Sequence, residues 1–267
     1  MNIKDIIDEY DNIVIGAGAG LSSASGFQYG GKTFMDNFYY MYQKYGYQDM
    51  YSAGFHDFSS LEEFWGFWAK YIYLNRYESG PKELYKRLFE LVKNKNYFVI
   101  TTNVDHQFQL SGFDKKRLFY MQGDYGLLQC SNKCHNKTYD NKDLIYKMLK
   151  ETKDNKIPSY LVPKCPICGS PMTTNLRCDE YFVEDDGWFR AKERYVNYLN
   201  KYKDKKILFL ELGVGYSTPV WIKYPFIKMT YNNKDAKYIV IDTGYQEIPK
   251  EIENQTIFIN DDINKII

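Results

Sequence analysis

The stretch Asn12-Ile-Val-Ile-Gly-Ala-Gly-Ala-Gly-Leu-Ser-Ser-Ala-Ser-Gly26 decides the fold of this chain. Its β-branched run, Ile13 to Ile15, predicts a buried strand that leads directly into a glycine-rich loop. Glycine has no Cβ, so a backbone of this kind can approach a diphosphate and present its N–H groups to it. The stretch therefore predicts a nucleotide site at the amino end of an α/β domain. The residues expected to cradle the diphosphate are Gly16, Ala17, Gly18, Ala19 and Gly20.

The same pattern also fits a tight strand-to-loop turn without a ligand, and both interpretations stay open at this point. A hydride-transfer dehydrogenase is disfavoured, because its fingerprint requires an acidic residue at the end of a second strand about twenty positions on. Asp36 has about that spacing, but the surrounding Phe34 to Tyr40 does not have the pattern of a strand end.

The composition excludes several classes of protein. With 267 residues and 44% apolar residues, the chain suits one large domain or a domain with insertions. A net charge of +1 argues against a dedicated nucleic-acid surface. No apolar run reaches the roughly eighteen residues of a membrane span, and the first residues lack a signal-peptide pattern. We therefore expect a cytoplasmic protein that binds neither nucleic acid nor membrane, with cysteines that are thiols or metal ligands rather than disulfides.

Five further apolar runs predict strands, at residues 97–101, 118–121, 207–210, 238–241 and 256–259. Helical stretches separate them, notably Pro81 to Asn94 and Trp188 to Tyr202, which is typical of a parallel sheet covered by helices on both faces. We expect a Rossmann-like domain formed by residues 1–30, 80–125 and 187–267. Residues 31–79 are expected to form a helical insertion, including an aromatic helix at Leu61 to Ile72, and residues 126–186 a second insertion.

The second insertion holds all five cysteines. Two knuckles, Cys130-x3-Cys134 and Cys165-Pro-Ile-Cys168-Gly, supply four thiolates, which can complete a closed tetrahedral shell around a structural zinc ion. His135 adjoins Cys134 and is an alternative ligand. Cys178 is left over, and a small buried role is its default interpretation.

These elements, in this order, resemble the sirtuin family of NAD-dependent enzymes over nearly the whole chain. The resemblance is carried by Gly18-Ala-Gly-Leu-Ser22, by Thr102-Asn-Val-Asp105, by a short strand ending at Gln122-Gly123, and by the four-cysteine insertion. The chain departs from the family at Gln28-Tyr-Gly-Gly31, where the family has Pro-Asp-Phe-Arg, and at Gly213-Val-Gly-Tyr-Ser-Thr-Pro219, where it has a Gly-Thr-Ser motif.

The resemblance implies a role for each matching residue. Asn103 would bind the nicotinamide ribose or an ordered water, beside Thr102, and Asp105 the nicotinamide carboxamide. Gln122 would hold the ribose hydroxyls. Ser22 has two alternatives, a contact to the cofactor or a helix N-cap. The remaining expected cofactor contacts, on the adenosine side, are Gly213, Gly215, Ser217 and Asp242.

Gln122 stands where the family has a histidine that acts as the general base of deacylation. A glutamine amide forms hydrogen bonds but does not titrate near neutral pH, so it cannot carry that proton. His106 follows Asp105 but occupies a variable position of the motif, and we do not assign it as a replacement base. Cleavage of the nicotinamide bond depends less on this base than the later deacylation steps do.

Gln122 and the late Gly-Val-Gly motif resemble the macrodomain-linked branch of bacterial sirtuins. This resemblance implies a protein ADP-ribosyltransferase that consumes NAD and modifies a protein acceptor, a lipoyl-carrying protein like the glycine-cleavage H protein. It also implies a macrodomain hydrolase as functional partner. Two alternatives remain: a lysine deacylase that tolerates glutamine, and a module that binds ADP-ribose or consumes NAD without a protein acceptor.

Overall fold

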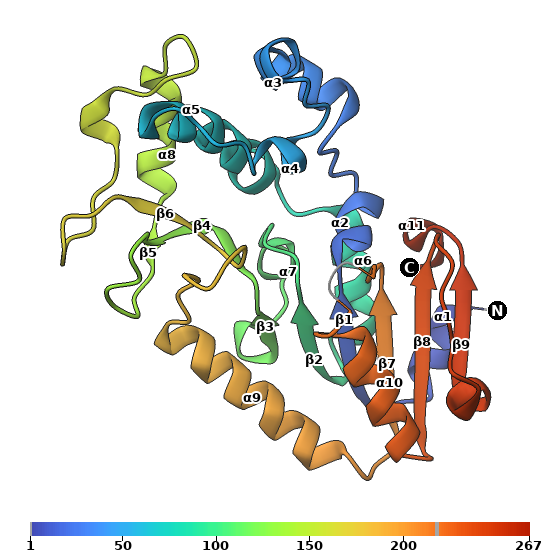
Figure 1. Cartoon of the computed structure of the whole chain (residues 1–267). Coiled ribbons are helices and arrows are strands. Elements are labelled where there is room, and N and C mark those ends of the chain that lie inside the picture. The colour runs from blue at the N-terminus through green and yellow to red at the C-terminus, as the bar shows by residue number, and fades with distance from the viewer. Residues whose placement is uncertain (1, 217–218) are drawn as a thin grey trace. The chain divides into compact units, whose positions relative to one another are not determined.

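The computed structural model describes residues 2–216 and 219–267. The chain forms two compact units (Figure 1). Unit 1 comprises residues 1–26, 81–122 and 186–267, and unit 2 comprises residues 27–80 and 123–185. The predicted division into one domain with two separate insertions stays a prediction. Among the described residues, no helix combines the length and apolar character needed to cross a membrane.

Unit 1 is built on a six-stranded sheet in the order β3-β2-β1-β7-β8-β9, and every neighbouring pair is parallel. This confirms the predicted parallel sheet, and all six expected strands are present. The strands are β1 (Asn12–Ala17), β2 (Asn96–Thr101), β3 (Leu118–Tyr120), β7 (Ile207–Leu212), β8 (Ala236–Asp242) and β9 (Thr256–Asn260).

Helices cover both faces of this sheet, as the unbroken apolar strands require. Along β1, Ile13 and Ile15 pack into the core on one face, whereas Val14 packs into the core on the other. The first face is covered by α1 (Ile3–Asp8), α2 (Ala19–Ala24), α6 (Glu83–Val92), α7 (Gln107–Leu110) and α11 (Ile263–Ile266). The second is covered by α9 (Asp186–Tyr202) and α10 (Lys223–Asn232). Short 3-10 turns lie at Lys115–Arg117 and Lys250–Gln255.

The direction of strand addition reverses at β1, which lies between β2 and β7. In parallel sheets, ligands bind at such a switch point, outside the carboxyl ends of the strands. The loops that follow β1 and β7 meet there: Gly18 N donates to Leu212 O (3.1 Å), and Gly20 N donates to Gly213 O (2.9 Å). The fold therefore places the glycine loop beside the Gly213 loop.

Unit 2 combines helices with a three-stranded antiparallel sheet in the order β5-β4-β6. The strands are β4 (Gly123–Cys130), β5 (Tyr139–Asp140) and β6 (Met172–Leu176). The helices are α3 (Gly31–Tyr45), α4 (Met50–Ala53), α5 (Leu61–Ile72), α8 (Lys142–Glu151), a π-helical turn at Tyr73–Tyr77 and a 3-10 turn at Ser159–Leu161. Helix α5 has the predicted bounds, and Ser60 caps it by accepting from Glu63 N (3.2 Å).

Two local predictions were wrong. Helix α6 begins at Glu83 rather than near Pro81, because Lys82 has an extended backbone and its N–H donates to Gln107 Oε1 (2.9 Å). Cys178 is exposed rather than buried, since it follows the end of β6.

Candidate active site

A buried polar cluster in unit 1 surrounds the carboxylate of Asp105, just beyond the carboxyl end of β2. Asp105 is 2% exposed and accepts from the hydroxyl of Ser22 (2.5 Å, at Oδ2) and from Gln107 N (3.0 Å, at Oδ1). The hydroxyl of Tyr85 lies 3.4 Å from Asp105 Oδ2. These contacts fix both carboxylate oxygens in position.

Asn103 joins this cluster to the glycine loop. Its Nδ2 donates to Gly18 O (2.9 Å) and approaches the Tyr85 hydroxyl (3.4 Å), while its own N–H donates to Thr101 Oγ1 (3.0 Å). The amide nitrogen is therefore turned toward the protein. No described residue donates to Asn103 Oδ1, so this oxygen stays available as an acceptor for a ligand hydroxyl.

The structure corrects one of the alternatives for Ser22. Gly18, not Ser22, is the N-cap of α2, and Ser22 lies within the helix at 2% exposure. Its hydroxyl donates to Asp105, so it orients that carboxylate.

The glycines of the loop are needed for internal packing. A Cβ on Gly18 would lie 2.6 Å from Gly213 O, one on Gly20 would lie 2.6 Å from Gly213 Cα, and one on Gly16 would clash with Ile222. Gly213 itself has a φ of +60°, which favours glycine. The N–H groups of Gly18 and Gly20 already donate to the chain after β7, so they are not free donors for a diphosphate.

Gln122 also lies beyond the carboxyl ends of the strands, two residues after β3 ends. The preceding residue is held on both sides: Met121 N donates to Thr101 O (3.1 Å), and Met121 O accepts from Trp188 Nε1 (3.0 Å). Gln122 is half-buried, and its amide has no hydrogen-bond partner among the described residues. Strand β2, which pairs with β3, ends at Thr101. The next residue, Thr102, donates its N–H to Ala17 O (3.1 Å).

A second polar cluster lies at the carboxyl ends of β7 and β8. Glu211, fully buried in β7, forms an ion pair with Lys223, which is 2% exposed at the start of α10. The Tyr238 hydroxyl donates to Glu211 Oε2 (2.5 Å). Burial raises the pKa of Glu211 above its ordinary value, and Lys223 and Tyr238 act against this shift.

This second cluster extends to Asp242. Lys223 Nζ also donates to Gln246 Oε1 (2.6 Å), and Gln246 Nε2 donates to Asp242 Oδ2 (3.2 Å). Sequence reasoning selected Asp242 but missed Glu211, Lys223 and Gln246. A Cβ on Gly215 would meet nothing within 4 Å, and the predicted contact Ser217 lies outside the described residues.

Sequence reasoning also missed Tyr85 and Gln107 in the Asp105 cluster. Tyr85 lies on the apolar face of α6, where a tyrosine resembles an ordinary core residue. Gln107 is fully buried at the start of α7. His106, which lies between Asp105 and Gln107, has a φ of 66°, in the left-handed region that is uncommon for residues other than glycine.

The four predicted zinc ligands come together in unit 2. The Sγ atoms of Cys130, Cys134, Cys165 and Cys168 all lie within 4.8 Å of one another. Two of the pairs, Cys130–Cys168 and Cys134–Cys165, are 3.6 Å apart. Four sulfurs around zinc at about 2.3 Å are separated by about 3.8 Å, so this cluster fits a closed tetrahedral site.

Two neighbours of the cysteine cluster contribute to it. Hydrogen bonds from Ser170 lower the pKa of the Cys168 thiol, whereas desolvation and the neighbouring thiols raise the pKa of Cys134. His135 Nδ1 lies 3.0 Å from Cys134 Sγ, and its Nε2 lies 2.9 Å from the Tyr139 hydroxyl. Four sulfurs already complete the shell, so His135 is a neighbour of the site.

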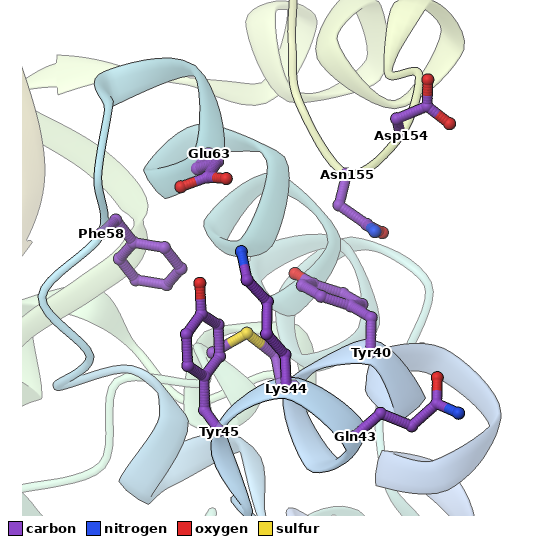
Figure 2. A pocket seen from close by; sticks show the side chains of 9 residues that line it. Tyr40, Gln43, Lys44, Tyr45, Phe58, Glu63, Asp154 and Asn155 are labelled. Carbon is purple, nitrogen blue, oxygen red and sulfur yellow. The ribbon is translucent and has the colours of Figure 1, made fainter.

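Unit 2 also has an open pocket of about 400 Å³, which Figure 2 shows from close by. Tyr40 and Tyr45 of α3 line it together with Phe58, and Lys44 extends toward Glu63 of α5. None of the predicted site residues lines this pocket. The candidate active site is therefore the switch point in unit 1.

Comparison with solved structures identifies the fold. A structure described as Sir2Tm bound to a propionylated peptide matches with a TM-score of 0.61 at 18% identity, covering 98% of this chain and 93% of the other. One described as Sir2-p53 peptide-NAD+ matches with a TM-score of 0.56 at 18% identity, with the same coverage. The chain thus has the sirtuin fold. No family model matches it.

Comparison with curated proteins then identifies the family. The chain is 40% identical over 266 residues to the protein ADP-ribosyltransferase of Staphylococcus aureus, covering 99% of this chain and 84% of that protein. It is 30% identical over 236 residues to a probable bifunctional ADP-ribose hydrolase/ADP-ribosyltransferase of Fusarium oxysporum f. sp. cubense, covering 83% of this chain and 38% of that protein. The chain belongs to the protein ADP-ribosyltransferase family and is an enzyme of the sirtuin type.

Proposed function

We propose that this enzyme transfers ADP-ribose from NAD to a protein side chain and releases nicotinamide. The observation that carries the proposal is the half-buried Gln122 amide, which lies beyond the carboxyl ends of the strands, as Asn103 does, and has no partner among the described residues. An amide can hold ribose hydroxyls but cannot remove a proton as a base. The site is thus suited to cleaving the nicotinamide bond and unsuited to base-dependent deacylation.

The residues of the Asp105 cluster divide this work in the proposal. Asn103 accepts from a ribose hydroxyl through Oδ1, because its Nδ2 is fixed on Gly18 O. Asp105, held by Ser22 and Gln107, accepts from the nicotinamide carboxamide. The fixed positions reduce the entropy lost when NAD is brought to a reactive geometry.

The glycine loop takes a modified role in the proposal. The N–H groups of Gly18 and Gly20 are used within the protein, and Ala17 is fully buried at the end of β1, so we assign the diphosphate contacts to Ala19 and the adjoining backbone. Gly16, Gly18 and Gly20 let the loop lie against the Gly213 segment. Gly213, Gly215, Ser217 and Asp242 are proposed for the adenosine side.

The acceptor and partners are proposed on narrower grounds. The resemblance to macrodomain-linked sirtuins favours a lipoyl-carrying acceptor like the glycine-cleavage H protein. A macrodomain hydrolase that removes the modification is the proposed functional partner. The name of the Fusarium relative, which joins an ADP-ribose hydrolase to a transferase, supports this pairing. We also propose that the enzyme acts in the cytoplasm, where four thiols stay reduced and able to bind zinc.

The experiment incubates the purified enzyme with adenylate-labelled NAD and a lipoylated carrier protein. We expect the label to appear on the carrier, together with released nicotinamide, and to disappear with Asp105→Asn. Acylated peptides are assayed in parallel. Rapid deacylation that falls with Gln122→Ala, without any labelled protein, would make deacylation the function instead. Nicotinamide release without any acceptor would identify an NAD-consuming enzyme.

A further inference from the structure

The ion pair between Glu211 and Lys223 is unusual because both side chains are almost fully buried in unit 1. Removing a carboxylate and an ammonium from water costs several kcal/mol per ion, and apolar residues of similar size often give equal stability. Lys223 also begins α10, where the helix dipole disfavours a positive charge. Stability alone therefore does not account for this pair.

The pair is connected to the surface by one amide. Gln246 is 7% exposed and lies in the segment after β8. Its Oε1 accepts from Lys223 Nζ (2.6 Å), which leaves its Nε2 pointing to Asp242 Oδ2 (3.2 Å). An amide without the lysine could rotate and present either atom, so the charge of Lys223 determines which end of Gln246 faces Asp242.

Asp242 is thereby held on both oxygens. Oδ2 accepts from Gln246, and Oδ1 accepts from Gly244 N (3.0 Å). The same lysine lies 5.3 Å from the centre of the Tyr216 ring, and the Tyr216 hydroxyl accepts from Glu247 N (2.9 Å). The segments after β7 and β8 are thus joined through Lys223.

We propose that Glu211, Lys223 and Gln246 form a positioning relay that sets the orientation of the Asp242 carboxylate toward the adenosine ribose of NAD. This proposal deepens the proposed function and rests on its assignment of Asp242 to the adenosine side. The three residues act through Asp242 and do not touch the reacting atoms. The relay therefore governs how tightly the nucleotide binds, whereas the Asp105 cluster governs the reaction.

The test replaces Gln246 with methionine, which keeps its length and removes the amide. We expect the Kd for ADP-ribose, measured by calorimetry, and the KM for NAD in nicotinamide release each to rise about tenfold, with kcat changed less than twofold. The control is Gln255→Met. The Gln255 Nε2 donates to Thr230 O, Asn233 O and Ala236 O, at the opposite end of β8. The Gln255→Met variant should therefore have a lower melting temperature and an unchanged Kd.

A double-mutant cycle tests whether the effect passes through Asp242. Asp242→Asn alone should weaken ADP-ribose binding, and adding Gln246→Met should weaken it less than twofold further. Fully additive effects, or a Gln246→Met variant with lowered melting temperature and unchanged Kd, would overturn the relay. If Gln246→Met does not fold, the pair Glu211→Gln with Lys223→Met removes both charges together and should raise Kd in the same way.

The outcomes also separate the relay from the proposed function. ADP-ribose binding requires no protein acceptor, so the relay can be established even if no protein becomes labelled. Conversely, label transfer to a carrier by the wild-type enzyme, together with unchanged binding in Gln246→Met, would retain the function and reject the relay.

Discussion

Closely spaced ionisable groups are stabilised in different ways in the two units. In unit 2, four cysteine sulfurs converge within 4.8 Å, an arrangement that requires a metal ion when the thiols ionise. In unit 1, the Glu211 carboxylate meets a cation from its own chain, Lys223. We therefore expect the cysteine site to depend on a bound ion for its stability. The Glu211–Lys223 ion pair, in contrast, is complete within the chain and can orient its neighbours.

Metal removal should have the largest effect. We expect about one zinc per chain, and loss of the β4–β6 arrangement in Cys165→Ser, because structural zinc contributes on the order of 10 kcal/mol in small domains. Metal analysis and hydrogen exchange measure these outcomes.

Cys178→Ser is the matched control for the zinc test, since Cys178 is exposed and outside the cluster. It should change the free energy of unfolding by less than about 0.5 kcal/mol. A metal-free protein whose β4 amides are still protected from hydrogen exchange would contradict the prediction that unit 2 depends on a bound ion.

Breaking the Glu211–Lys223 ion pair should have the second largest effect on stability. Lys223→Met leaves Glu211 buried with its charge uncompensated, so we expect the free energy of unfolding to fall by about 3–5 kcal/mol in denaturant titrations. Adding Glu211→Gln should restore most of this loss, since no buried charge then remains. A double variant as unstable as Lys223→Met would mean that side-chain packing, rather than charge, explains the effect.

The contact between the uncharged Gly20 and Gly213 backbones should contribute less to stability than the ion pair does. Gly20→Ala places a Cβ about 2.6 Å from Gly213 Cα, a backbone atom that cannot move alone. We expect a loss of about 1–3 kcal/mol in thermal unfolding. Gly80→Ala is the control, because a Cβ there meets nothing within 4 Å. Equal stability of the two variants would show that the loops separate easily.

The Asp105 cluster should give the smallest effect on stability. Its carboxylate accepts from neutral donors, among them the hydroxyls of Ser22 and Tyr85 and the backbone N–H of Gln107. Ser22→Ala should cost about 1–2 kcal/mol in unfolding and slow nicotinamide release about tenfold, because Asp105 Oδ2 loses the nearer of its two hydroxyl donors. Unchanged nicotinamide release in Ser22→Ala would show that Ser22 does not influence the reaction.

Local patterns in the sequence were sufficient to predict the sheet and the cysteine cluster. Apolar runs such as Ile13 to Ile15 predict strands because both faces of a parallel sheet are buried. Cysteine spacing predicts a metal site because the ligands lie in two short knuckles. Asn103, Asp105 and Gln122 were selected through the family resemblance, and their roles stay predictions.

The relay could not be predicted in this way. Glu211 interrupts an apolar strand, which is a local signal of a buried charge, but nothing nearby identifies its partner. Lys223 and Gln246 lie 12 and 35 residues further along the chain and meet Glu211 or each other only in the folded sheet. Tyr85 was missed for a related reason, because its role depends on contacts across α6, α2 and the segment after β2.

The contact between Gly20 and Gly213 has a consequence for evolution. Each glycine occupies the space that a side chain on the other would need, and a Cβ built on Gly213 would lie 2.5 Å from Gly20 Cα. A larger residue at one position cannot be compensated by a smaller residue at the other, because both positions are already glycine. The two positions therefore cannot change one at a time. Both glycines are required for the contact between the two loops, whether or not a ligand is bound.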